Sequence, residues 1–251
     1  MAYITLNRKS LAINYSYLQQ LFKKNSIEWA PVLKMLCGNK TYLEYVLSLG
    51  EEQVCDARLS NLKKIKAINP NKETVYIKPP AKRSIKNVVK YADVSFNTEF
   101  TTIKWLSEEA VKQEKIHRII IMIELGDLRE GILGEHLMAF YKKIFELPNI
   151  KISGIGANLN CLSGVMPSKD KLIQLSLYEQ LIEAKFGKKI DFVSGGSSVM
   201  IPLLLSKQIP KGINHFRIGE TLFFGVDLFT NNTIPKMKND VSKKNRVSFQ
   251  L

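Results

Sequence analysis

Residues 191–220, DFVSGGSSVMIPLLLSKQIPKGINHFRIGE, predict the fold of this chain. The runs DFVSGG (191–196) and NHFRIG (214–219) have the composition of buried strands, and an apolar helix begins near Val199 between them. A helix that joins two such strands places them parallel in one sheet. The stretch therefore predicts an α/β fold.

The same alternation of strand and helix extends over most of the chain. Six further strands are predicted at 29–36, 52–57, 74–79, 93–97, 118–125 and 151–159. Helices are predicted at 41–50, with Gly50 as C-cap, and at 60–69, 84–92, 98–114, 134–147 and 171–187. Eight strands favour a closed (β/α)8 barrel of the TIM type, with an open doubly wound sheet as the alternative. We expect the barrel to span residues 1–226 and the polar, basic residues 227–251 to form a loosely held tail or the stump of a second domain.

The composition is that of a globular protein, with 45% hydrophobic and 24% charged residues, and it excludes a disordered or collagen-like chain. No apolar run approaches the roughly 18 residues of a membrane span, and the first residues lack the pattern of a secretory signal. Three widely spaced cysteines suit a reducing compartment. The expected location is therefore cytoplasmic, without a membrane partner.

The chain carries a formal net charge of +14, with basic clusters at 63–66, 78–90 and 236–246. Nucleic-acid binding is the less favoured interpretation, because the sequence has no recognition helix, zinc finger or aromatic-interleaved RNA motif. A solvated surface, or attraction of anionic metabolites, also accounts for the charge. The histidines have no metal-ligand spacing, so no metal site is expected.

Lys34 follows the apolar run WAPVL (29–33) at the end of the first predicted strand. Active sites of barrels form at the carboxyl ends of their strands. Burial beside Leu33 and Met35 would lower the pKa of such a lysine, as a Schiff-base lysine requires. A strand-end lysine whose ammonium reaches solvent is the alternative, and the residues alone do not decide between them.

Two glycine turns follow the last two predicted strands, SGGSS (194–198) and FRIGE (216–220). Ser197 or Ser198 caps the next helix, and the backbone N–H groups of such a turn can bind an anion. Each turn alone could be an ordinary glycine turn. Because the loops after strands 7 and 8 commonly bind phosphate in barrels, the two together predict a cofactor that carries phosphate.

The loops after the fifth and sixth strands are rich in polar residues. ELGDLREG (124–131) contains Arg129, which suits a bidentate carboxylate contact, although its charges could simply pair with one another. GANLNCLSG (156–164) places Asn158 and Cys161 at the barrel mouth. The asparagine could equally satisfy loop backbone groups, and a lone cysteine is most often inert.

Six motifs in this order, PVLKMLCG, DARLSNLKKIK, ELGDLREGI, GANLNCLSGV, SGGSS and INHFRIGE, carry a family resemblance. They resemble the pyridoxal-phosphate-dependent alanine racemase N-terminal-domain fold, and most closely its ornithine-racemase-type amino-acid racemases. The resemblance covers roughly residues 2–226. It implies a TIM barrel, pyridoxal 5'-phosphate (PLP) as cofactor, a small amino acid as substrate, and a homodimer as the candidate assembly.

The resemblance also implies catalytic roles. Lys34 matches the lysine that binds the cofactor aldehyde and then acts as the base on one face of the substrate Cα. Arg129 matches an arginine near the cofactor's phenolic oxygen and the substrate carboxylate. Arg217 matches the arginine that faces the pyridine nitrogen. Its permanent charge discourages protonation of that nitrogen, which weakens the electron sink and favours proton removal and return over transamination.

The resemblance further implies a set of cofactor contacts. Ser198, together with Ser197, and the backbone of Gly219 and Glu220 match the phosphate cradle. Asn158 stands where classical alanine racemases carry a histidine beside the pyridine ring, so that contact is altered.

The chain also departs from the family. Its racemases continue into a mostly β domain that supplies a tyrosine to the partner's site as the opposite-face base, whereas this chain stops at Leu251, about where that domain would begin. Cys161 and Cys37 are candidate substitutes, with water or slow one-base exchange as further options. A PLP-dependent racemase of ornithine, lysine or alanine is therefore the leading prediction. A barrel-only PLP homeostasis protein without turnover is the alternative, and a degenerate, nucleic-acid-binding barrel is the third.

Overall fold

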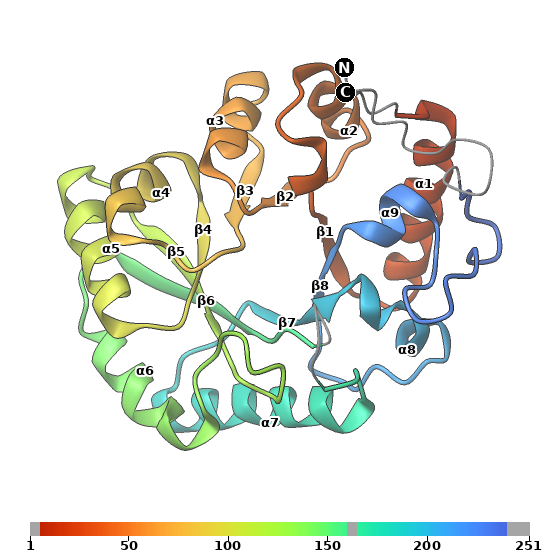
Figure 1. Cartoon of the computed structure of the whole chain (residues 1–251). Helices are drawn as coiled ribbons and strands as arrows, with labels where there is room; N and C mark the ends of the chain where they lie inside the picture. Colours follow the sequence, from red (N-terminus) through yellow and green to blue (C-terminus); the bar gives the residue numbers. More distant parts are fainter. Residues whose placement is uncertain (1–5, 160–164, 240–251) are drawn as a thin grey trace.

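Eight parallel strands form a barrel with helices around it in the computed structural model, which describes residues 6–159 and 165–239 (Figure 1). The strands are β1 (Glu28–Pro31), β2 (Gln53–Asp56), β3 (Glu73–Tyr76), β4 (Val94–Asn97), β5 (His117–Met122), β6 (Ile150–Gly156), β7 (Phe192–Ser197) and β8 (His215–Ile218). They pair in the order β1-β8-β7-β6-β5-β4-β3-β2, and a parallel bridge between Val32 and Cys55 joins the two ends. The prediction of a TIM-type (β/α)8 barrel is confirmed.

Helices connect consecutive strands and cover the outside of the barrel. They are α1 (Arg8–Lys24), α2 (Lys40–Leu47), α3 (Leu59–Ile68), α4 (Ile85–Tyr91), α5 (Phe100–Lys112), α6 (Leu137–Phe145), α7 (Lys169–Phe186), α8 (Ile201–Leu205) and α9 (Glu220–Phe224), with the 3-10 turns η1 (Lys34–Leu36), η2 (Lys82–Ser84), η3 (Gly134–His136) and η4 (Ser198–Met200). Helix α7 ends at Gly187 with φ 61°, as predicted. The C-cap predicted for α2 is wrong, because Ser48 rather than Gly50 ends that helix, with its N–H on Glu44 O.

Helix α1 precedes the first strand and was not among the predicted helices. Asn7 caps its N-terminus by accepting the N–H of Ser10 at 3.2 Å. Leu11, Leu18 and Phe22 share one buried face of the helix. Apolar residues at this spacing form a stripe that packs on the barrel, and the stripe is the signal that could have found the helix.

Two apolar clusters stabilise the fold. The larger one lies between strands and helices and includes the buried faces of the surrounding helices. The smaller one takes alternate residues of adjacent strands, which places it in the barrel interior, and consists of Ala30, Val32, Cys55, Val75, Val94, Phe96, Ile120 and Met122. Phe96, from this inner cluster, also lines the cavity at the carboxyl ends of the strands.

The first strand is shorter than predicted. It ends at Pro31, and after Leu33 the chain turns into η1 rather than continuing extended to residue 36. A continuous apolar run does not by itself distinguish a strand from a buried turn. Lys34 therefore lies just beyond the strand, at the barrel rim.

The described part of the C-terminal segment is held against the barrel. Ile234 and Met237 are buried in the larger apolar cluster. The side chain of Asn14, on α1, donates to Leu222 O (3.1 Å) and Lys238 O (3.0 Å) and accepts the N–H of Lys238 (2.7 Å). The segment 227–239 runs beside α1 and α9 and is attached to the barrel at Ile234, Met237 and Lys238, while most of its other side chains are exposed (Figure 1).

Candidate active site

A cavity of about 650 Å³ lies at the carboxyl ends of the strands. Eight of the predicted site residues line it: Lys34, Arg129, Asn158, Ser197, Ser198, Arg217, Gly219 and Glu220. The wall is completed by Val32, Ile77, Phe96, Val199, Leu228, Phe229 and Asn231. Cys161, predicted as a candidate second base, lies outside the described residues. The structure therefore brings together the predicted residues that it describes, from the carboxyl ends of five strands, β1, β5, β6, β7 and β8, and the loops after them.

Lys34 is the first residue of η1, and its side chain is exposed at the mouth of the cavity. The prediction that Lys34 is buried among apolar neighbours is wrong. Those neighbours turn into the core, since Leu33 and Leu36 are buried, while the short helix presents the lysine to the cavity. The alternative, a strand-end lysine that reaches solvent, describes its position better.

Arg58 fixes the backbone that carries Lys34, a role that the sequence analysis missed. Its guanidinium Nη1 donates to Lys34 O at 3.0 Å and contacts the Cys37 sulfur at 3.6 Å. Its own N–H donates to the buried carboxylate of Asp56 at 2.8 Å, and Asn61 Nδ2 donates to the same carboxylate at 3.0 Å. Burial raises the pKa of Asp56. The motif DARLSN thus links the end of β2 to η1, which carries Lys34. In the sequence, an arginine two residues after a strand-ending aspartate could have indicated this role.

Arg217, on β8, is only 3% exposed and is held on several sides. Its Nη2 donates to Ala157 O at 2.9 Å and to Asn158 Oδ1 at 2.8 Å. Its Nη1 donates to Ser194 Oγ, and the guanidinium carbon lies 5.0 Å from the centre of the Phe96 ring. A buried guanidinium needs such partners, and together they fix its plane at the floor of the cavity.

A polar relay joins Arg217 to Arg129 across the cavity. Asn158 accepts from Arg217 and donates its Nδ2 to Glu130. The other carboxylate oxygen of Glu130 accepts from Arg129 Nε at 2.7 Å. The expectation that charges of this loop pair with one another therefore holds for Arg129 and Glu130, while Arg129 still lines the cavity.

The loop after β5 is shaped by Glu124 and two glycines. Glu124 Oε1 accepts the N–H groups of Gly126 and Leu128, so this carboxylate organises its own loop. Gly131 has φ 153°, and a Cβ there would lie 2.3 Å from Glu124 N. Only glycine allows the loop to return this closely to the strand. Asp127 is 6% exposed, and neither carboxylate oxygen has a hydrogen-bond partner among the described residues.

Ser198 ties the loops after β7 and β8 together. Its hydroxyl oxygen accepts the N–H of Gly219 at 3.1 Å and that of Thr221 at 3.3 Å. Ser198 is 3% exposed, so these bonds are shielded from water. Ser197 lines the same cavity but makes no side-chain capping bond. The two turns predicted to bind an anion are therefore adjacent in space.

Two negative findings concern only the described part of the chain. Residues 6–159 and 165–239 contain no group of three or more His, Cys, Asp or Glu residues arranged to hold a metal ion. Within the same ranges, no helix is both long and apolar enough to cross a membrane. Cys37 is exposed and does not line the cavity.

The fold and the cavity define this chain as a (β/α)8 barrel with a lysine, two arginines and a serine-rich turn facing one site at the carboxyl ends of its strands. The family model for "Alanine racemase, N-terminal domain" matches residues 6–227, and the chain belongs to that family.

Two curated relatives are similar in sequence. The ornithine racemase of Acetoanaerobium sticklandii is 36% identical over 239 residues, which cover 95% of this chain and 67% of the relative. The lysine racemase of Thermotoga maritima is 27% identical over 231 residues, which cover 92% of this chain and 64% of the relative. The chain thus spans about two thirds of the length of these relatives.

Solved structures share the fold at low sequence identity. The alanine racemase of Clostridium difficile 630 in complex with cycloserine superimposes with a TM-score of 0.73 at 13% identity, covering 92% of this chain and 63% of the other. PipY of Synechococcus elongatus, solved with PLP bound, has a TM-score of 0.68 at 14% identity and covers 84% of this chain and 99% of the other. The matched region makes up 63% of the alanine racemase chain, whereas it makes up 99% of the PipY chain.

Proposed function

We propose that this chain binds PLP in the cavity at the carboxyl ends of the strands and acts as an amino-acid racemase. The observation that carries the proposal is the convergence of Lys34, Arg129 and Arg217 with the Ser197–Ser198 turn on one cavity. The names of the two curated relatives favour ornithine or lysine as the substrate, with alanine as a further candidate.

The residues of the cavity fit such a cofactor. A volume of about 650 Å³ lies within the usual range for sites that hold a cofactor or a small ligand. Hydroxyl groups of Ser197 and Ser198 and the N–H of Glu220, where α9 begins, would hold the phosphate, while Gly219, whose own N–H donates to Ser198 Oγ, lets the backbone approach it. Asn158 would lie beside the pyridine ring, and Lys34 is the amine available to the aldehyde.

PLP, when bound, supplies an aldehyde for amines and a ring that delocalises negative charge from the substrate Cα. The amine Nζ of Lys34 would remove a proton from one face of Cα and return it. The guanidinium of Arg129, already oriented by Glu130, would bind the substrate carboxylate. Arg217 keeps its positive charge at the floor of the cavity, so a ring nitrogen beside it would stay unprotonated.

Racemisation needs a second proton donor on the opposite face of Cα. Cys161 stays the candidate within this chain, with water as the alternative. A homodimer, a cytoplasmic location, and the division into a PLP-binding barrel at 1–226 and a polar, basic segment at 227–251 also belong to the proposal.

A second candidate function is a PLP-holding protein without turnover. The observation that favours it is the match to PipY, of which the alignment covers 99%. Both candidates use Lys34 to hold the cofactor, and they differ in whether the Cα proton of an amino acid exchanges.

Absorbance tests the cofactor. Purified protein incubated with PLP should show the visible band of a lysine-bound cofactor, and Lys34→Ala should lose it. Lys40→Ala is the matched control, because Lys40 is an exposed helix lysine paired with Glu44. A wild-type protein without the band, or a band retained in Lys34→Ala, contradicts the proposal.

Proton exchange then separates the two functions. The holoprotein is incubated in heavy water with L-ornithine, L-lysine or L-alanine. Deuterium at Cα with loss of optical rotation supports the racemase, and no exchange with any of them supports the holding protein. Exchange with retained rotation indicates one-sided chemistry by Lys34 alone.

A further inference from the structure

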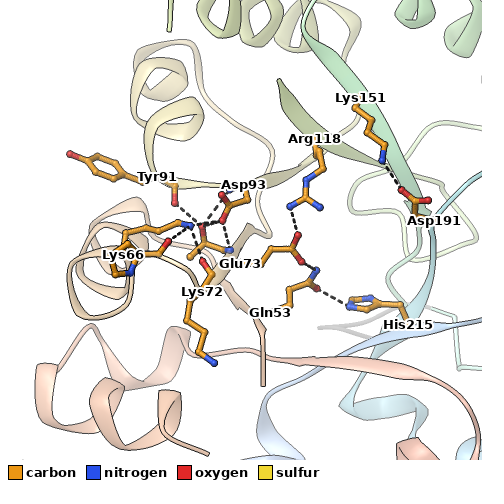
Figure 2. A network of polar contacts seen from close by, with 12 residues as sticks. Gln53, Lys66, Lys72, Glu73, Tyr91, Asp93, Arg118, Lys151, Asp191 and His215 are labelled. Atoms are coloured by element: carbon orange, nitrogen blue, oxygen red, sulfur yellow. Dashed lines mark hydrogen bonds and ion pairs between the residues drawn. The ribbon is translucent and has the colours of Figure 1, made fainter. Parts of the chain in front are cut away.

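A set of polar side chains lies on the other side of the cavity floor, at the amino-terminal end of the barrel, where Gln53, Glu73 and His215 line a second cavity of about 420 Å³. Gln53, Glu73, Arg118 and His215 come from four different strands, β2, β3, β5 and β8. Figure 2 shows Arg118, Glu73, Gln53 and His215 joined end to end by polar contacts. His215 lies two residues before Arg217 on β8, so both side chains point into the barrel. A polar set of this kind inside a closed barrel calls for an account of each of its hydrogen bonds.

The contacts form one unbroken chain from the cavity floor downward. Arg217 Nη1 contacts Ser194 Oγ, which lies 2.7 Å from His215 Nδ1. The other ring nitrogen, Nε2, lies 3.0 Å from Gln53 Oε1. Gln53 Nε2 then donates to Glu73, whose second carboxylate oxygen accepts from Arg118.

The chemistry of the end groups fixes the direction of every bond between Arg217 and Glu73. A guanidinium only donates, so Ser194 Oγ accepts from Arg217 and gives its own proton to His215 Nδ1. His215 must then carry its proton on Nε2 and donate it to Gln53 Oε1. The Gln53 amide donates in turn to the Glu73 carboxylate, which only accepts. Donors and acceptors match at each step for one tautomer of a neutral His215.

The surroundings keep His215 in that neutral state. The ring is 3% exposed, and burial together with the charge of Arg217 lowers its pKa to about 3. A second proton, on Nδ1, would remove the acceptor for the Ser194 hydroxyl and face the guanidinium with another positive charge. The network therefore has a single arrangement near neutral pH.

We infer that His215 is a positioning residue for the site, acting through Ser194 to orient the guanidinium of Arg217 toward the cavity. This inference rests on the proposed function for the role of Arg217 toward the cofactor, but the orientation itself is a property of the chain alone. Arg217 keeps its Nη2 contacts to Ala157 and Asn158 and its Nη1 contact to Ser194 O at 3.4 Å in either case. Removal of His215 takes away the acceptor of the Ser194 hydroxyl, so the oxygen that accepts from Nη1 is no longer held in one orientation.

The test compares His215→Phe with His117→Phe. Both histidines are buried, both have a pKa lowered mainly by burial, and each is hydrogen-bonded to a serine, but His117 bonds to Ser95 outside this network. His215→Gln is the rescue variant, because its amide offers one acceptor and one donor in place of the two ring nitrogens.

The first measurement needs no cofactor. Nitrogen-15 NMR of the wild-type protein should show His215 as the neutral Nε2–H tautomer at neutral pH. The Arg217 Nη1 protons should exchange slowly with water in the wild type, His117→Phe and His215→Gln, and faster in His215→Phe, whereas the Nη2 protons should stay protected in all four proteins. The Nδ1–H tautomer in the wild type, or an Arg217 signal unchanged by His215→Phe, overturns the inference. If His215→Phe does not fold, the wild-type tautomer and the His215→Gln spectrum still decide.

The second measurement uses the holoprotein. In His215→Phe the visible band should shift and kcat should fall by about tenfold with KM little changed, whereas His117→Phe should leave both near wild type. Equal effects of the two phenylalanine variants would show a merely structural role. A wild-type protein that binds no PLP would contradict the proposed function, and the NMR experiment would still decide the positioning role.

Discussion

Replacing Ser198 by alanine tests whether its hydroxyl joins the loops after β7 and β8. The substitution removes the acceptor for two backbone N–H groups, those of Gly219 and Thr221. Thr221 is fully buried, so no water replaces the lost acceptor there. Each buried donor left unpaired costs about 1–3 kcal/mol, and because Gly219 is half-buried we expect a total of roughly 2–4 kcal/mol.

Thermal unfolding measures this loss. At about 2–4 °C per kcal/mol for a chain of this size, Ser198→Ala should lower the Tm by roughly 5–15 °C. Ser197→Ala is the matched control, since Ser197 lines the same cavity without a side-chain capping bond and should change stability by less than about 0.5 kcal/mol. Both variants should weaken stabilisation of the protein by inorganic phosphate. Equal losses of Tm in the two variants, or an unchanged Tm in Ser198→Ala, would refute the idea that the Ser198 hydroxyl holds the loops after β7 and β8 together.

Three further predictions concern stability. Gly131→Ala should lower the free energy of unfolding by more than about 2 kcal/mol, because its Cβ would overlap the backbone of Glu124. Gly187→Ala, with open space at φ 61°, should lower it by about 1 kcal/mol, and urea unfolding compares the two variants. Burial lowers the pKa of His117 to about 4, so the unfolded chain binds a proton that the folded one does not as pH falls from 6.5 to 4. As the pH falls from 6.5 to 4, the free energy of unfolding should therefore decrease more steeply in the wild type than in His117→Phe, by up to about 1.4 kcal/mol per pH unit. If urea unfolding gives equal slopes of this free energy against pH for the two proteins, the predicted sign is wrong. Asn14→Ala removes three hydrogen bonds and should speed proteolysis within residues 227–239, and an unchanged cleavage rate would show that apolar packing alone holds the segment.

The sequence was sufficient for the parts of the fold that depend on local pattern. Strand–helix alternation predicted the barrel, the rule that sites form at the carboxyl ends of strands selected Lys34 and Arg129, and the family resemblance added Arg217. All three line one cavity. Lys34 and Arg129 could be located in this way because each follows a separate strand.

Details set by long-range packing were not predictable. The burial of Lys34 was misjudged, because the end of β1 depends on where η1 begins. The contact between Gln53 and His215 joins residues 162 positions apart. Ser194 faces His215 across β7 and β8 next to a register shift between Ser194 and Ser197, and no single-sequence pattern encodes this pairing.

The hydrogen bonds between Asn14 and Lys238 have a consequence for how the chain folds during synthesis. Helix α1 leaves the ribosome early, but two of its hydrogen bonds wait for Lys238, 224 residues later. Until then the apolar side of α1 lacks part of its cover, and closing so long a loop is slow. The first helix can therefore complete its packing only after residue 238 has been synthesised, 224 positions after Asn14.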